Sequence, residues 1–361
     1  MSGKPDEERG RPMTNKWARV VVRSALLLGA AVVLFSPARA QTSPNAAKAK
    51  TSPAGVVQTS RTPQGQSDLE GVWSIAFLTP LQRDPQLGNK QFFTPEEAAA
   101  YLKKRSQELD ADRRDLPPDD DTALAYNQAW YDRGTKLGRN MRTSLVIDPP
   151  DGRIPPMTPE AKRRFENTHA YSAAHPADGP EDRTLGERCL NFSQEGPPLL
   201  PGGYNNNYQI VQTRNYVAIL AEMGNKARII PLDGRPHLPQ SVSQWNGDSR
   251  GHWEGKTLVV DTTNVRFNDK SHFGVNYDGL TDQNLRVTER FTRTAADTIT
   301  YQATVNDPTV YTKPWTMEIV MSKTEDPLFE YACHEGNYGM FGILGGARAD
   351  EKKAAEQGGH Q

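Results

Sequence analysis

Leu285-Arg-Val-Thr-Glu-Arg-Phe291 alternates apolar and polar side chains, which is the pattern of a β-strand that turns one face inward. Short runs rich in β-branched residues lie on both sides of this stretch, separated by turn pairs such as Asp233-Gly234 and Ala296-Asp297. The runs are 208–213, 216–222, 228–232, 257–262, 298–305, 315–322 and 328–332. This density of strands predicts a mainly β protein, either an antiparallel barrel or a sandwich, because both architectures leave few strand edges exposed. Of the two we favour the barrel.

A helical insertion precedes most of these strands. Thr94-Pro-Glu-Glu97 offers a capping side chain, a proline at the first helical position and acidic residues in the first turn. A helix is therefore expected to run from there to about Leu109. We expect further helices over 122–132 and 158–167, and a single β-rich domain over 67–348 with the helical insertion at about 94–140.

The N-terminal 40 residues have the pattern of a secretory signal peptide. Basic residues up to Arg23 precede the uncharged run 24–35, and small residues stand before a cleavage point after Ala40. The alternative is a retained anchor, but so short a run does not span a bilayer core of roughly 30 Å. Residues 41–66, rich in Ser, Thr, Ala, Pro and Gln, are expected to form a disordered linker, and 349–361 a disordered tail. The sequence thus predicts a periplasmic or secreted protein.

The charge balance excludes some classes of partner. The chain has 43 basic and 44 acidic side chains, a formal net charge of −1. Residues 1–40 contain seven of the basic and three of the acidic residues, so cleavage after Ala40 leaves a net charge of −5. An acidic chain lacks the basic surface typical of nucleic-acid binding and of attachment to anionic membranes. A small molecule is the partner that we expect.

The two cysteines, Cys189 and Cys333, are expected to form a disulfide in an oxidising compartment. The alternative is a reactive or metal-ligating thiol at Cys333, next to His334. The histidines do not show the spacing of a helical zinc site, and the chain has neither a glycine-rich dinucleotide loop nor a phosphate-binding loop. We therefore expect no metal and no cofactor.

Cys333-His-Glu-Gly-Asn-Tyr338 is the first candidate site. In an extended strand Glu335 points to one side and His334 to the other. Both are suited to general acid–base catalysis, and Asn337 is suited to holding a substrate oxygen. The alternative is a structural end-strand whose polar groups cap loops.

The second candidate site is the polar loop that begins at Asp233-Gly-Arg-Pro-His237. His237 and Asp248 are candidate catalytic residues there, since loops on a rigid sheet often carry binding groups. Aromatic rings for stacking and guanidinium groups for pairing with a carboxylate follow closely. The alternative is an Asp248–Arg250 ion pair beside two core tryptophans. The candidate ligand contacts are Trp245, Trp253, Arg235, Arg250, Asn264 and Asn337.

Five stretches of the chain resemble a large family of exported bacterial proteins of unknown function. They are Tyr126-Asn-Gln-Ala-Trp-Tyr-Asp-Arg-Gly134, 144–156, Arg228-Ile-Ile-Pro-Leu-Asp-Gly-Arg-Pro-His237, 244–264 and Tyr331-Ala-Cys-His-Glu-Gly-Asn-Tyr338. The resemblance implies export and a domain over Gly71–Arg348, and it carries no activity. Val265 stands where the family usually has Phe. Gly71-Val-Trp73 is similar to the opening of lipocalin-type barrels, where the tryptophan plugs the base.

These observations support two functions. The first is a secreted or periplasmic β-barrel that binds a small ligand, partly apolar or aromatic. The second is an enzyme, a lyase, isomerase or hydrolase, that uses His334, Glu335, His237 and Asp248 for acid–base chemistry in the same pocket.

Overall fold

The computed structural model describes residues 60–113, 115, 127–266 and 284–358, which belong to one compact unit, Gly55–Gln361. The expected signal peptide, the linker up to residue 59 and the first part of the expected 122–132 helix lie outside the described residues. Residues 60–66 form a turn, which the bridge between Arg61 and Ser67 closes.

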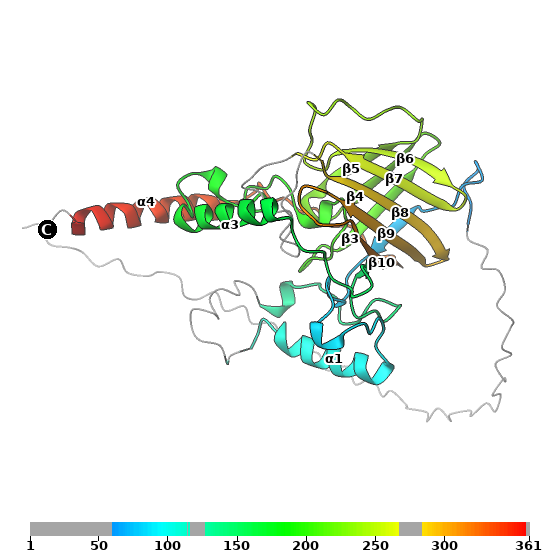
Figure 1. The fold of residues 1–361 in the computed structure, drawn as a ribbon, viewed down its shortest axis with the longest axis horizontal. Helices are drawn as coiled ribbons and strands as arrows, with labels where there is room; N and C mark the ends of the chain where they lie inside the picture. The colour runs from blue at the N-terminus through cyan, green and yellow to red at the C-terminus, as the bar shows by residue number, and fades with distance from the viewer. Residues whose placement is uncertain (1–59, 114, 116–126, 267–283, 359–361) are drawn as a thin grey trace, which may run out of the picture. The chain divides into compact units, whose positions relative to one another are not determined.

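Ten strands form one antiparallel sheet in the order β5-β4-β3-β1-β10-β9-β8-β7-β6, and β2 also pairs with β10 (Figure 1). Neighbours in sequence pair along most of the ladder, and β1 lies between β3 and β10. The strands are β1 (Gly71–Ser74), β2 (Val146–Asp148), β3 (Asn207–Gln212), β4 (Tyr216–Ala221), β5 (Ala227–Pro231), β6 (Asp248–Glu254), β7 (Thr257–Thr263), β8 (Arg286–Ala295), β9 (Thr298–Asn306) and β10 (Trp315–Thr324). The mainly β, antiparallel prediction is confirmed.

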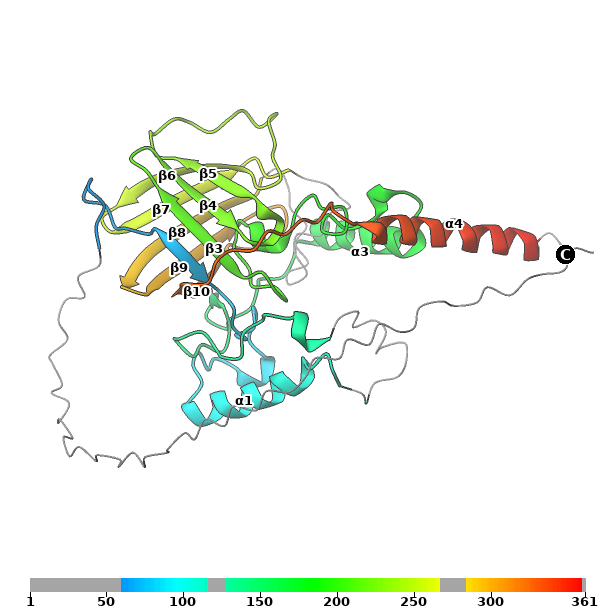
Figure 2. The same ribbon diagram turned by 180° about the vertical axis from the view of Figure 1, so that it is seen from behind.

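The sheet is not closed into the barrel that we favoured. No backbone pairing joins β5 to β6 within the described ranges, although the two ends of the sheet curve toward each other (Figures 1 and 2). A Cβ placed on Gly251 of β6 would lie 2.8 Å from Ile230 Cγ2 and 2.7 Å from Leu232 Cδ2. The edges therefore meet through side chains rather than through a backbone ladder. We call this junction between β5 and β6 the seam.

The expected strand over 328–332 is absent, and β6 forms where a loop was expected. Strand formation needs a partner edge as well as propensity. Asp248–Glu254 finds that edge on β7, in a register that pairs Arg250 with Asp261. Residues 328–332 have no partner strand and run instead to a turn at Cys333.

The helix α1 (Pro95–Glu108) begins as its sequence predicts. The Thr94 hydroxyl accepts from the Glu97 amide, and the Glu97 carboxylate accepts from the Thr94 amide, which caps the first turn. Helix α3 (Pro159–Ala174) extends beyond the expected end, and α4 (Tyr338–Gly358) makes the expected tail helical as far as Gly358. Single 3₁₀ turns lie at Pro85–Leu87, Gln128–Trp130, Pro180–Asp182, Ser193–Glu195 and Met223–Asn225. No helix among the residues described is both long and apolar enough to cross a membrane.

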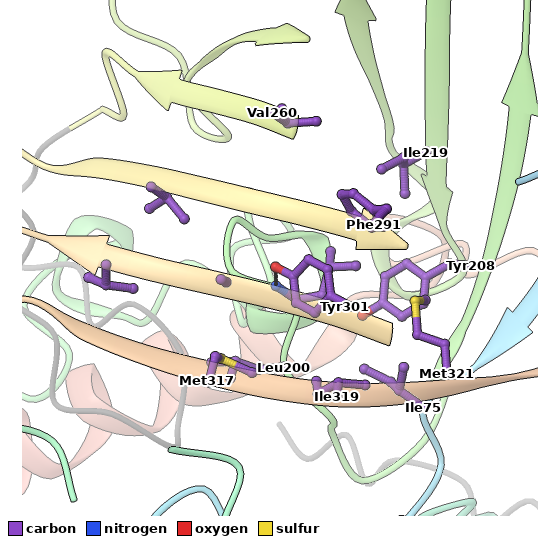
Figure 3. Packing of buried hydrophobic residues seen from close by; sticks show 14 of the residues in the cluster. Ile75, Leu200, Tyr208, Ile219, Val260, Phe291, Tyr301, Met317, Ile319 and Met321 are labelled. Carbon is purple, nitrogen blue, oxygen red and sulfur yellow. Dashed lines mark hydrogen bonds between the residues drawn. The ribbon is translucent and has the colours of Figure 1, made fainter. Parts of the chain in front are cut away.

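The core lies between the two halves of the curved sheet. Ile219 of β4 and Phe291 of β8 point toward each other across it (Figure 3). Trp73 is fully buried, and its indole N–H donates to the Leu69 carbonyl at 2.9 Å. The largest fully buried side chains are Trp73, Trp315, Tyr208, Tyr301 and Phe291. Full burial of a large apolar side chain stabilises a fold by roughly 1.5–3 kcal/mol.

Candidate functional site

His237 bridges two carboxylates at the start of the loop between β5 and β6. Its Nδ1 lies 2.9 Å from Asp248 Oδ2, and its Nε2 lies 3.0 Å from Asp261 Oδ2. The two aspartates come from adjacent antiparallel strands, and Arg250, two residues after Asp248, is the direct partner of Asp261. Alternate residues of a strand share a face, so the register places both carboxylates on the side where His237 lies.

Arginines complete this cluster. Arg250 Nη1 donates to Asp248 Oδ1 at 2.6 Å, and Arg286 donates to both oxygens of Asp261 at 2.6 and 2.7 Å. Burial tends to raise the pKa of Asp261, but the hydrogen bonds from Arg286 and His237 outweigh it and lower this pKa. Each ring nitrogen of His237 therefore has an aspartate oxygen as its hydrogen-bond partner. Neither ring nitrogen is left to bind a substrate in this arrangement, and the two hydrogen bonds hold the loop in place.

Two of the expected ligand contacts also hold this loop. Asn264 adopts φ 56°, a conformation that asparagine tolerates, and its amide donates to the carbonyls of Leu238, Pro239 and Val242 at 2.9–3.1 Å. Arg235 is exposed and pairs with Asp233. The Asn264 contacts hold the loop after β5 against the end of β7, whereas the Arg235–Asp233 pair lies within the loop.

The Cys189–Cys333 disulfide is confirmed, with the two Cα atoms 5.7 Å apart. Cys333 lies in a turn rather than in a strand, so the expected alternation of His334 and Glu335 does not apply, and both side chains are exposed. Asn337 donates to the Glu187 carbonyl at 3.1 Å. Asn337 therefore ties the C-terminal segment to the body, as the capping alternative predicts.

A cavity of about 480 Å³ lies at the seam, and we call it the seam pocket. Residues 227–229 of β5, the loop 243–247 and the start of β6 line it, together with Glu195 and Arg266. Trp245 and Asp248 are the expected site residues that reach it. The Arg266 guanidinium lies 4.9 Å from the centre of the Trp245 ring. Trp253 packs against the core instead, as a core tryptophan would.

Arg228, on the wall of the seam pocket, belongs to a buried ion pair. Arg228 Nη2 lies 2.9 Å from Glu289 Oε1 and Nη1 lies 2.5 Å from Oε2, and Tyr301 donates to Glu289 at 2.9 Å. The Arg228 Nε has no hydrogen-bond partner in the part of the chain that the structure describes. Sequence reasoning missed this pair. The alternating pattern of this strand could have indicated a buried charge, because Glu289 occupies an inward position between Val287 and Phe291.

Glu195 is the other group that sequence reasoning missed. Its side chain is 1% exposed, and Oε2 accepts from Lys226 Nζ at 3.2 Å and from Asn246 Nδ2 at 3.5 Å. Burial raises the pKa of Glu195, and Lys226 offsets only part of that rise. No local pattern marks this residue, since Glu195 is buried by segments distant in sequence.

No group of three or more His, Cys, Asp or Glu side chains is placed to hold a metal in the described ranges. The chain is an open, strongly curved antiparallel β-sheet protein with a small polar pocket where its two edge strands meet. Comparison with family models, curated proteins and solved structures finds no match to it.

Proposed function

We propose that this chain is a secreted or periplasmic protein that binds a small, partly aromatic ligand in the seam pocket. One observation carries the proposal: a cavity of about 480 Å³ lies where β5 and β6 fail to pair, with an aromatic ring on its wall and a buried arginine beneath. Small-molecule sites are typically about 300–1,000 Å³ and combine aromatic surface with a few polar groups.

The pocket favours a flat ligand that carries a negative charge. Trp245 offers a ring face for stacking. Lys226 is paired with Glu195, and Arg228 with Glu289, whereas no carboxylate within the described ranges pairs with Arg266. A guanidinium that stacks on a ring and that no described carboxylate pairs with matches a ligand carboxylate. An aromatic carboxylate fits both requirements.

Export is supported by two observations. A disulfide closed over a separation of 144 residues fits an oxidising compartment, and the signal-peptide pattern ends at Ala40. The resemblance to exported bacterial proteins implies the same. Mass spectrometry of the mature protein tests this proposal: we expect Gln41 at the N-terminus, and an uncleaved chain recovered from the cytoplasm would contradict it.

Calorimetric titration tests the binding proposal with benzoate and indole-3-acetate as probes, and with cyclohexanecarboxylate and benzyl alcohol as comparisons. We expect the aromatic carboxylates to bind best. Trp245→Ala is expected to weaken them by roughly 0.5–1.5 kcal/mol, about 2- to 13-fold in Kd. Trp130→Ala, at an exposed tryptophan outside the pocket, is the matched control. Equal binding by wild type and Trp245→Ala, or failure of all four compounds to bind, would contradict the proposal.

An enzyme in the same pocket is the second candidate, and Glu195 is the observation that favours it. A buried carboxyl with a raised pKa beside a cavity is a common arrangement for a general acid or base. His237 and Asp248 would then position the loop rather than transfer protons. Conversion of any bound compound by wild type, lost in Glu195→Gln while binding persists, would support catalysis. Identical turnover by Glu195→Gln would rule Glu195 out as the acid–base group.

A further inference from the structure

A second, larger cavity of about 1090 Å³ lies apart from the seam pocket, and we call it the groove. Three segments supply most of its lining: 77–85 after β1, the second half of α1 with Leu109 and Arg133, and residues between 184 and 204. The first two segments are tied together, since the Tyr101 hydroxyl donates to the Leu78 carbonyl at 3.2 Å. The groove shares no lining residue with the seam pocket.

Several large apolar side chains line the groove. They include Leu78, Leu81, Leu109, Leu145, Phe192 and Leu200. Such a wall favours a ligand with an extended apolar part, because each buried CH₂ contributes about 0.8 kcal/mol.

The charged side chains of the groove are mostly cationic. Arg83, Lys104, Arg105 and Arg133 line it, against the two carboxylates of Asp84 and Glu108. Glu108 forms two ion pairs, with Arg105 at 2.9 Å and with Lys104 at 3.7 Å. The groove therefore has an excess of positive charge.

Arg133 is the groove cation that lies over an aromatic ring. It is partly buried, its guanidinium lies 3.5 Å from the centre of the Tyr131 ring, and Nη1 donates to the Leu109 carbonyl at 2.9 Å. None of the carboxylates that the structure describes pairs with it. Burial lowers the pKa of Arg133, Tyr131 offsets part of that change, and the nearby Arg105 lowers the pKa as well. A partly desolvated guanidinium is unfavourable where no described carboxylate pairs with it, and an anion placed beside it would remove that penalty.

We propose that the groove is a binding site for an amphipathic anion, with an apolar chain against the leucine-lined wall and a carboxylate or phosphate head on Arg133. Both head groups accept paired hydrogen bonds from a guanidinium. Arg105, close to Arg133, adds a second positive charge for the head. The proposal does not depend on the seam pocket having a ligand.

Calorimetric titration of the full mature protein tests this site with dodecanoate, dodecyl phosphate and dodecanol, each kept below micelle formation. We expect both anions to bind at least about tenfold more tightly than dodecanol, a difference of about 1.4 kcal/mol. The anion that binds more tightly identifies the preferred head group. Leu109→Trp, which fills the groove, is expected to abolish binding of all three compounds without lowering the unfolding temperature.

Arg133→Met separates the charge from the apolar contacts. We expect it to weaken both anions by about tenfold or more and to leave dodecanol unchanged. Arg290→Met, at an exposed arginine of β8 paired with Glu254, is the matched control and is expected to bind like wild type. Three results would overturn the proposal: no binding by any dodecyl compound, equal binding of dodecanol and dodecanoate, or wild-type affinity in Arg133→Met. Loss of dodecanoate binding in Trp245→Ala with retention in Arg133→Met would place the probe in the seam pocket and would also overturn it.

Discussion

Arg228 of β5 and Glu289 of β8 form a two-point ion pair inside the curved sheet, with side chains that are 6% and 0% exposed. In the ladder, β5 is one edge strand and β8 is the third strand from the other edge. The pair therefore links the two halves of a sheet whose ends share no backbone hydrogen bonds in the described ranges. The pair lies beside the seam pocket and adds a polar contact between the two halves of the sheet to the apolar contacts of the core.

Removal of one partner of this pair is expected to be strongly destabilising. Arg228→Met or Glu289→Leu leaves an unpaired buried charge and should lower the free energy of unfolding by about 3–5 kcal/mol. The double variant should lose much less than the sum of the two, since it leaves no buried charge. Urea unfolding measures this cycle. The exposed pair Arg290–Glu254 is the matched control, expected at about 1 kcal/mol or less. Additive losses at Arg228 and Glu289 would contradict the coupling.

Gly247, on the wall of the seam pocket, is expected to tolerate no side chain. It adopts φ 72°, and an added Cβ would lie 2.6 Å from the Thr263 carbonyl oxygen. Gly234 adopts φ 73° with nothing within 4 Å of such a Cβ. Gly234→Ala should therefore cost only the conformational penalty of roughly 1–2 kcal/mol, and Gly247→Ala clearly more. Thermal and urea unfolding compare the two, and equal losses would show that the close approach to Thr263 is unimportant.

Asp261 should make the free energy of unfolding fall at low pH. Its folded-state pKa is lowered because Arg286 and His237 outweigh burial, so the unfolded chain binds the proton more readily. The contribution of Asp261 is fully present above its unfolded pKa of about 3.9 and is lost as pH falls through the folded value. Between pH 6 and pH 3, Asp261→Asn and Arg286→Gln should each lose less unfolding free energy than wild type does. Wild-type pH dependence in both variants would contradict this assignment.

Loss of the Cys189–Cys333 disulfide should destabilise the whole domain. A bridge closed over a separation of 144 residues is worth about 5 kcal/mol on the chain-entropy account, and 2–5 kcal/mol is typical when a native bridge is removed. The double variant Cys189→Ser/Cys333→Ser should therefore unfold at lower urea. Hydrogen exchange should rise in α4, which the bridge helps to hold to the body together with Arg348, a donor to the Ala177 and Asp178 carbonyls. Unchanged urea midpoint and exchange would show that the bridge is dispensable.

Local sequence patterns were sufficient to predict most of the strands, the start of α1 and the disulfide. Period-two alternation in 285–291 determines which side chains face inward, and Thr94-Pro-Glu-Glu97 supplies its own helix cap. In a chain with two cysteines, an intramolecular disulfide can join only those two. Each of these predictions depends on neighbours in sequence or on residue chemistry alone.

The candidate site could be predicted only in part. The sequence placed His237, Asp248, Trp245 and Arg250 in one loop region, and the structure brings them together around the seam. The sequence did not predict that both ring nitrogens of His237 would be hydrogen-bonded to aspartates. Asp261 is brought to His237 only by the register between β6 and β7.

Only the tertiary structure decided that the sheet stays open at the seam and that Arg228 pairs with Glu289. It also decided that Glu195 and Arg133 are removed from water, so that burial shifts the pKa of each toward the neutral form. Closure of a sheet depends on curvature summed over ten strands and on contacts such as Gly251 with Ile230, which join residues 21 positions apart. The periodicity of a strand specifies the faces of its side chains, whereas the partner that an inward charge meets depends on the packing of the whole chain.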